Sequence, residues 1–424
     1  MRDEAEPGAS GRTARSRRQL LAAGTALIGG SLAGRAMAAE TGGEDTPPHV
    51  PRWMKEPGAD VGSQPYGQPS PYEKDVIRNI PKGGKQYTSS ASRTPLQDLD
   101  GIITPNGLFY ERHHGGIPEI DPAAHRLMIH GLVERPLLLT MDELRRFPTE
   151  SHIYFLECSG NPGFEVIKQG KTASDLVGLA SCCEWTGVRL KTILDEVGVK
   201  PEARWVVAEG ADAAALTRSV PLAKCLDDAL LVFSQNGERL RPQQGYPVRL
   251  LLPGFEGNMS VKWLRRLNVV TEPAYSREET SKYTDSMPDG TARQFTFVME
   301  AKSVITAPSG GQRLQEPGFH EIRGLAWTGR GRISGVEVST DGGVSWREAR
   351  LEGPVLPRCF TRFRLPWRWE GGPARLLSRA RDETGYVQPS REALVAVRGT
   401  RSFYHNNAVF GWSIGPDGAV TYAA

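Results

Sequence analysis

Apolar residues between about residue 101 and residue 288 gather in short runs that predict a mixture of strands and helices. One run, at 190–197, has the spacing of a helix. Thr140, followed three residues later by Glu143, predicts a capped helix N-terminus. The runs that predict strands lie at 125–133, 152–157, 205–208, 246–253 and 261–270. This part of the chain is therefore predicted to be a mixed domain of helices and strands.

The pattern changes after about residue 291, where short strands and turns take over. Residues 332–339 and 345–351 flank an Asp-Gly-Gly turn at 341–343, which is the signature of a hairpin. Further runs typical of strands follow at 360–365 and 374–380. This spacing predicts an immunoglobulin-like β-sandwich, so the fold class of the whole chain is expected to be α+β.

The N-terminus has the three regions of an export signal. Arg17 and Arg18 stand just before an apolar run at 20–32, and a small-x-small cleavage sequence follows at 36–38. Because the apolar run is shorter than the roughly 20 residues that span a membrane, it predicts a removable signal and no anchor. A twin-arginine pair is typical of the route that exports folded proteins, so we expect the mature protein in the periplasm.

Composition narrows the function classes further. The 424 residues carry a formal net charge of +3, and 39% are hydrophobic, as in a soluble globular protein. No lysine- or arginine-rich tract lies in the folded region, which argues against nucleic-acid binding. The five cysteines lack zinc or haem spacing, and their odd number leaves a thiol unpaired in an oxidising compartment. The predicted organisation is a signal peptide at 1–39, an extended surface leader at 40–100, a mixed domain at 101–290 and the β-sandwich with a tail at 291–424.

Cys158 is the first candidate for chemistry. It follows the predicted strand at 152–157, and Gly160 and Gly163 behind it let backbone approach a ligand closely. A thiolate is a soft ligand that suits a transition metal. A single cysteine is also common as a small buried apolar residue, so this residue alone leaves both interpretations open.

Two further clusters combine positive charge with turns. Residues 110–114, Tyr-Glu-Arg-His-His, offer charge-assisted hydrogen bonds to the phosphate of a cofactor. Arg249 and Lys262 flank a turn with Gly254, where backbone N–H groups and fixed charge suit an anion. Each cluster is also typical of an ordinary solvated loop, and the adjacent histidines leave a zinc site open.

Separated motifs occur together in the order found in the sulfite oxidase family of molybdopterin enzymes, which the chain resembles from about 101 to 398. The motifs are Glu-Cys-Ser-Gly-Asn at 157–161, Glu-Trp-Thr-Gly at 184–187, Gly-Tyr-Pro-Val-Arg at 245–249 and Val-Lys-Trp at 261–263. The resemblance implies a molybdopterin-binding catalytic domain followed by an immunoglobulin-like dimerisation domain. It also implies a Mo-molybdopterin cofactor with a cysteine ligand and oxygen-atom transfer to sulfur. No haem is expected in this chain, because the sequence has no C-x-x-C-H haem-attachment site.

The resemblance assigns roles to individual residues. Cys158 matches the molybdenum ligand. Arg112, Tyr283 and Arg398 match groups that line the family's substrate-anion pocket, and they are the predicted catalytic residues. The residues that match cofactor-binding positions are Tyr110, Arg112, His114, Asp212, Arg249, Ser260, Val261 and Lys262.

The chain departs from the family pattern at this pocket. Gly163 stands where an arginine is usual, Gln244 replaces a cofactor-binding histidine, and the pocket tryptophan after the cysteine motif is absent. Losing an arginine removes a bidentate partner for an oxyanion and opens space. The departures therefore favour a sulfur atom presented on an arm over free sulfite.

These departures and the ending Tyr-His-Asn-Asn-Ala at 404–408 resemble one branch of the family. That branch oxidises sulfane sulfur on a cysteine of a sulfur-carrier protein and passes electrons to a c-type cytochrome subunit, and it implies a homodimer within a larger assembly. The alternatives within the family are oxidation of a small sulfur oxyanion such as sulfite and reduction of a sulfoxide. The alternative from another class is a non-catalytic exported β-sandwich binding protein with a structural cysteine.

Overall fold

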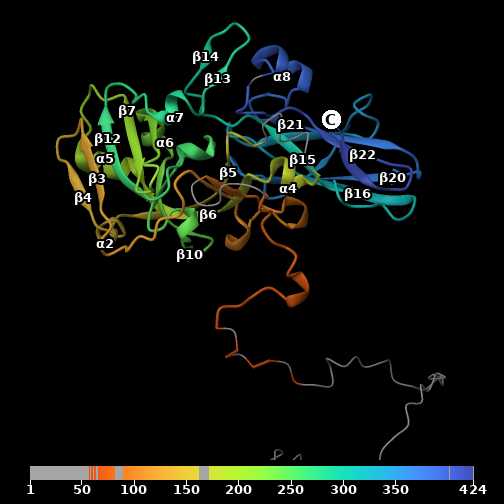
Figure 1. Ribbon diagram of the computed structural model, residues 1–424, viewed down its shortest axis with the longest axis horizontal. Helices are drawn as coiled ribbons and strands as arrows, with labels where there is room; N and C mark the ends of the chain where they lie inside the picture. Colours follow the sequence, from red (N-terminus) through yellow and green to blue (C-terminus); the bar gives the residue numbers. More distant parts are fainter. Residues whose placement is uncertain are drawn as a thin grey trace, which may run out of the picture. The chain divides into compact units, whose positions relative to one another are not determined.

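The computed structural model describes residues 57, 59–60, 62–63, 65–81, 89–161, 171–400 and 402–423 (Figure 1). The chain divides into Met1–Gln68 and Pro69–Ala424, and the fold below is that of the second unit. The predicted signal peptide and Gly163 lie outside the described residues. Within the described ranges, no helix is long and apolar enough to cross a membrane.

The first sheet of the mixed domain has the strand order β4-β3-β12-β7-β8. Its strands are β3 (Leu127–Gly131), β4 (Leu137–Leu139), β7 (Trp205–Gly210), β8 (Thr217–Pro221) and β12 (Leu264–Val270). Strand β12 runs parallel to β3 and antiparallel to β7. The helices of this region are α2 (Met141–Leu144), α5 (Leu190–Val197) and α6 (Leu222–Asp227). Ile193 of α5 packs with Ile129 and Leu267 of the sheet in one buried core, which fixes the sheet behind the site.

The second sheet carries the candidate cysteine. Its order is β10-β9-β6-β5, and β11 also pairs with β9. The strands are β5 (Thr149–Glu157), β6 (Ala180–Arg189), β9 (Leu230–Gln235), β10 (Glu238–Arg239) and β11 (Arg249–Leu251). Beside it, β1 (Ser90–Ser92) pairs with β2 (Glu111–His113), and α4 (Ala173–Val177) lies next to the end of β5. Because β5 ends at Glu157, the next residue, Cys158, emerges at the edge of the sheet.

The C-terminal region is a sandwich of two antiparallel sheets. One sheet contains β15 (Lys302–Ala307), β16 (Gly318–Trp327), β20 (Thr361–Trp369) and β19 (Arg350–Glu352). The other contains β18 (Arg347–Glu348), β17 (Ile333–Ser339), β21 (Ala374–Asp382), β22 (Gly411–Ile414) and β23 (Val420–Ala423). Trp327, Phe363 and Trp412 are fully buried in the core of this region. The α+β fold class with a C-terminal sandwich is confirmed.

The remaining short elements lie in the N-terminal segment, in loops of both regions and in the link between the regions. They are η2 (Pro71–Glu73), η3 (Leu96–Asp98), η4 (Asn106–Leu108), η5 (Pro242–Gln244), η6 (Gly257–Met259), α7 (Arg277–Thr280), β13 (Asp285–Ser286), β14 (Ala292–Arg293) and α8 (Arg391–Arg398). Figure 1 shows α7, β13 and β14 on the chain that leads from the mixed domain into the sandwich.

The structure confirms some predicted elements and corrects others. The helix at 190–197 has the predicted bounds, and the capping box of Thr140 and Glu143 is present. The predicted strand at 246–253 shrinks to β11, because Pro247 and Pro253 lack an amide hydrogen for a strand ladder.

Two other expectations also need correction. The second hairpin strand, predicted at 345–351, divides into β18 and β19, which pair with strands of opposite sheets. The expectation of a surface leader fails at its end, because Ser90–Ser92 forms a strand and Leu96 is fully buried in the core. The predicted leader has too little apolar periodicity to reveal a segment that is ordered by long-range contacts.

Candidate functional site

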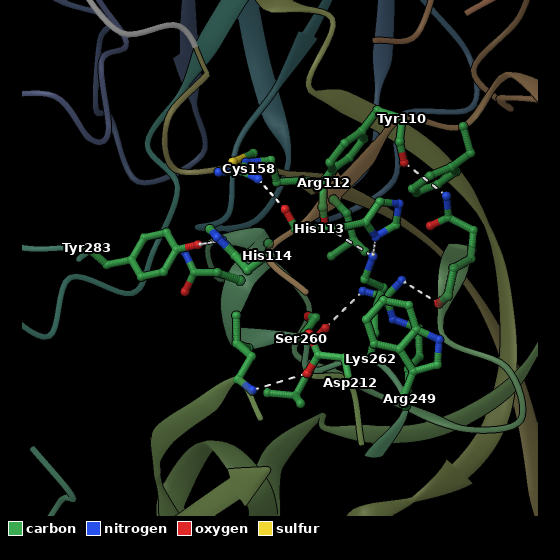
Figure 2. Close-up of a pocket in the computed structure, with 18 residues that line it drawn as sticks. Tyr110, Arg112, His113, His114, Cys158, Asp212, Arg249, Ser260, Lys262 and Tyr283 are labelled. Atoms are coloured by element: carbon green, nitrogen blue, oxygen red, sulfur yellow. Dashed lines mark hydrogen bonds between the residues drawn. The ribbon is translucent and has the colours of Figure 1, made fainter. Parts of the chain in front are cut away.

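Cys158 lies at the mouth of a cavity with about 650 Å³ of space unfilled by protein atoms. Lining residues come from the end of β5, the start of β11 and the loops before β12 and after β7. Figure 2 shows their side chains around the cavity. The sequence-predicted residues that line it are Tyr110, Arg112, His114, Cys158, Asp212, Arg249, Ser260, Val261, Lys262 and Tyr283. The fold therefore brings together residues that lie far apart in the chain.

The turn after β5 holds Cys158 in place. The backbone N–H of Cys158 donates to the carbonyl of Leu179 (2.9 Å), and that of Asn161 donates to the carbonyl of Cys158 (3.0 Å). Burial raises the pKa of the Cys158 thiol, while Arg112 opposes the shift. Figure 2 shows Arg112 extending toward Cys158. A thiolate at this buried position needs a further positive charge, which a bound metal ion would supply.

Arg249 and Lys262 place positive charge in the buried wall of the cavity. Arg249 donates to the carbonyls of Gln244 and Ser260, each at 3.0 Å, and its Nε has no hydrogen-bond partner among the described residues. Burial lowers its pKa to about 10. Burial, and then the charge of Arg249, lower the pKa of Lys262 well below its ordinary value. The described residues give neither cation a carboxylate within salt-bridge distance, so this wall of the cavity suits an anionic ligand.

The two histidines at 113 and 114 are neutral hydrogen-bonding groups. Burial and the neighbouring cations lower the pKa of each to about 3. Lys262 donates from Nζ to His113 Nδ1 (2.8 Å), so the ring carries its hydrogen on Nε2, which lies 2.9 Å from Glu111. His114 Nε2 lies 2.7 Å from the hydroxyl of Tyr283. These contacts fix the 110–114 segment against the cavity.

Tyr283 is held from three sides. Its φ is 54°, its hydroxyl meets His114, and the Arg218 guanidinium carbon lies 4.9 Å from its ring centre. Arg218 is itself buried between Glu256 and Glu279, at 3.1 Å from each. Burial, and then the nearby Cys158, raise the pKa of the Tyr283 phenol, so it remains a hydroxyl donor at neutral pH. Sequence reasoning missed the supporting ion pairs, because they join three distant segments.

A second, wider cavity opens outside Cys158 and Tyr283. It has about 1510 Å³ of unfilled space. Its basic lining comes from Arg93, Arg112, Arg277 and Lys282, and its aromatic lining from Tyr283, Phe403 and Tyr404. The lining also includes Asp175, whose carboxylate lies 3.8 Å from Arg93, and the remaining basic groups make the cavity suitable for an anionic ligand.

The remaining predicted residues occupy other positions. Gln244 donates from Nε2 to the carbonyl of Tyr110 (2.9 Å), so it supports the 110–114 segment. Arg398, at the end of α8, is absent from the linings of both cavities as described above. Its guanidinium donates to the carbonyl of His405 (2.9 Å) and to Glu300 (3.2 Å). The family resemblance locates this residue near the pocket. In the structure, its ion pair with Glu300 directs the guanidinium toward the interface between the two domains.

The donor set fits a cofactor that brings its own metal ligands. In the described ranges, no three His, Cys, Asp or Glu side chains converge on a point that could hold a metal. A metal at Cys158 would therefore take its other ligands from a bound cofactor. The unpaired Nε of Arg249 and the buried ammonium of Lys262 suit the phosphate of such a group. Gly257 lets the Tyr110 hydroxyl pack against the backbone beside the cavity, since a Cβ at this position would lie 2.7 Å from that hydroxyl.

Comparisons with known proteins match both regions of the chain. Residues 114–278 match the family described as oxidoreductase molybdopterin binding domain, and residues 293–411 match the Mo-co oxidoreductase dimerisation domain. Mitochondrial sulfite oxidase of Mus musculus is 34% identical over 352 residues, which cover 76% of this chain and 64% of the mouse protein. The chain thus spans less than two thirds of that relative. Sulfite oxidase of Gallus gallus is 32% identical over 69% of each protein.

A solved structure is similar over most of its length. The crystal structure of the sulfane dehydrogenase SoxCD from Paracoccus pantotrophus has a chain that superposes with a TM-score of 0.86 at 47% sequence identity. The match covers 88% of this chain and 97% of that chain.

Proposed function

Because the chain belongs to the sulfite oxidase family of molybdopterin oxidoreductases, we propose that it oxidises sulfur at a molybdenum cofactor held over Cys158. The observation that carries the proposal is that the buried thiol of Cys158 lines the same cavity as Arg249 and Lys262. Among the described residues, neither of these cations has a carboxylate within salt-bridge distance, and the Nε of Arg249 has no hydrogen-bond partner. When bound, the cofactor supplies oxygen-atom transfer to sulfur. The chain supplies the anion-binding wall, the thiolate and the substrate-facing groups.

Each group has a proposed part in the reaction. Arg249, Lys262 and the 110–114 segment bind the cofactor, and Asp212 and Ser260 shape the same wall. Arg112 stabilises negative charge that develops on the oxidised sulfur, because it borders both cavities. Tyr283 orients the reacting group through its hydroxyl, which His114 holds.

The substrate we propose is a sulfane sulfur carried on a cysteine of a carrier protein. Two observations support it: the wide basic cavity outside Cys158, and the similarity to a structure named sulfane dehydrogenase. Free sulfite is the second candidate, supported by the similarity to vertebrate sulfite oxidases. Reduction of a sulfoxide would use the same site with a different redox partner.

The assembly and location follow from the same relationship. We propose a homodimer formed through the sandwich, supported by the match to a dimerisation domain. A c-type cytochrome subunit is the proposed electron acceptor, since the chain has no haem-attachment sequence of its own. The adjacent Arg17 and Arg18 support export by the twin-arginine route to the periplasm.

Steady-state assays on the cofactor-loaded protein test the substrate. Free sulfite, a carrier protein loaded with sulfane sulfur and methionine sulfoxide are compared with one artificial electron acceptor or donor. A kcat/KM highest for the loaded carrier supports the proposal, and the same carrier without its sulfane sulfur is the control. A preference for sulfite selects the second candidate, and no turnover of any substrate by protein with full molybdenum content would favour a binding protein.

A further inference from the structure

The turn that bears Cys158 is tied to the sandwich domain by one buried ion pair. Lys302 begins β15, and Glu157 ends β5 directly before the cysteine. The side chains of Lys302 and Glu157 are 1% and 0% exposed. Lys302 Nζ donates to Glu157 Oε1 and also to the carbonyl of Asn161. One ammonium group therefore binds both ends of the turn, which runs from Glu157 to Asn161.

Every other polar atom in this cluster is also engaged. Trp327, at the end of β16, donates from Nε1 to Glu157 Oε2 (2.7 Å). The Asn161 amide donates to Glu157 Oε1 (3.1 Å) and to the carbonyl of Val177 (2.9 Å). The carboxylate therefore has partners on both oxygens, from both structural regions. A satisfied buried network of this kind selects one geometry.

We propose that Lys302 is a positioning residue that holds Cys158 in the orientation required by the metal. The inference rests on the proposed function, since it takes Cys158 as the ligand. The sandwich domain then contributes to the active site as well as to assembly. A metal ligand has to be held within about 0.5 Å of its productive geometry, and groups behind the ligand orient it and tune the metal.

The alternative is a purely structural ion pair, and two variants separate the roles. Lys302→Met removes the cation and leaves the buried carboxylate of Glu157 without a positively charged partner. Lys302→Met/Glu157→Gln removes both charges, keeps an oxygen for Trp327, and relieves the cost of an unpaired buried charge. The matched control is Arg358→Met, which breaks another ion pair between the two regions, 2.8 Å to Asp228, away from the cavity lining.

The test measures molybdenum per chain, the Mo(V) electron paramagnetic resonance spectrum, kcat and the thermal unfolding midpoint. We expect the double variant to regain the midpoint yet to keep a shifted or heterogeneous Mo(V) spectrum and a kcat reduced by roughly 10- to 100-fold per molybdenum. Arg358→Met should keep the wild-type spectrum and kcat.

A double variant with the wild-type spectrum and a kcat within twofold of wild type would overturn the proposal. Where Lys302→Met alone does not fold, the double variant decides. Wild-type protein that binds no molybdenum would instead overturn the proposed function, and the inference with it.

Discussion

His405 connects the two structural regions and gives the protein a stability that depends on pH. Its Nε2 lies 3.2 Å from Glu256 in the mixed domain, and its Nδ1 lies 3.5 Å from Glu300 at the start of the sandwich. Burial lowers the pKa of His405, but the hydrogen bonds and charges of the two carboxylates outweigh it and raise the pKa from 6.5 to about 9. The charged imidazolium is therefore the form that the fold stabilises.

The size of the effect follows from this shift. One pKa unit corresponds to about 1.4 kcal/mol, so His405 contributes roughly 3 kcal/mol to the free energy of unfolding. Because the folded pKa lies above the unfolded value, the contribution is complete below about pH 6.5 and disappears as the pH rises toward 9. In His405→Gln this part of the pH dependence should be lost.

Urea unfolding of the cofactor-free protein between pH 6 and pH 10 measures this contribution. The difference between wild type and His405→Gln isolates it from the other groups that titrate in this range. The control is His125→Gln: burial lowers the pKa of His125, so the control variant should keep the wild-type slope above pH 6.5. Equal slopes for wild type and His405→Gln would refute the reasoning.

Three further variants test the cavity. Lys262→Met should weaken cofactor retention by roughly 10- to 100-fold, because it removes a charge-assisted contact. The pterin and molybdenum content of the protein after dialysis measures this retention. The control is Lys191→Met, at an exposed lysine. Unchanged retention would separate Lys262 from the cofactor. Tyr283→Phe should lower kcat by roughly 100-fold or more at full molybdenum content, since the hydroxyl held by His114 is lost. Because the pKa of His114 is about 3, this histidine should cause no change in the kcat/KM of the wild-type enzyme between about pH 5 and 8. A pH-dependent change in this range that disappears in His114→Gln would contradict the neutral form of His114.

Local signals in the sequence identified the elements that depend on local interactions. The helix Leu190–Val197 and the capping box at Thr140 follow from spacing and from cap chemistry within a few residues. The sandwich follows from its hairpin spacing. The sequence does not predict strand β1, because its partner β2 lies about twenty residues away and its own sequence, Ser-Ala-Ser, has no apolar periodicity.

The site was predictable residue by residue only through the family resemblance. Cys158, Arg249 and Lys262 are each weak signals alone, yet the fold places them around one cavity. The groups behind them could not be found this way. The Lys302–Glu157 pair spans 145 positions, and no periodicity reports a contact of that range. The direction of the Arg398 side chain, toward Glu300, likewise depends on packing between two domains.

X-ray absorption at the molybdenum edge tests the central claim most directly. Wild-type protein and Cys158→Ser are loaded with cofactor and compared for the sulfur atoms around the metal. If Cys158 is the ligand, wild type shows a thiolate sulfur in addition to those of the pterin, and Cys158→Ser retains the pterin sulfurs, loses the thiolate contribution and has no turnover. An identical sulfur shell in both proteins would contradict the account and return Cys158 to a structural role.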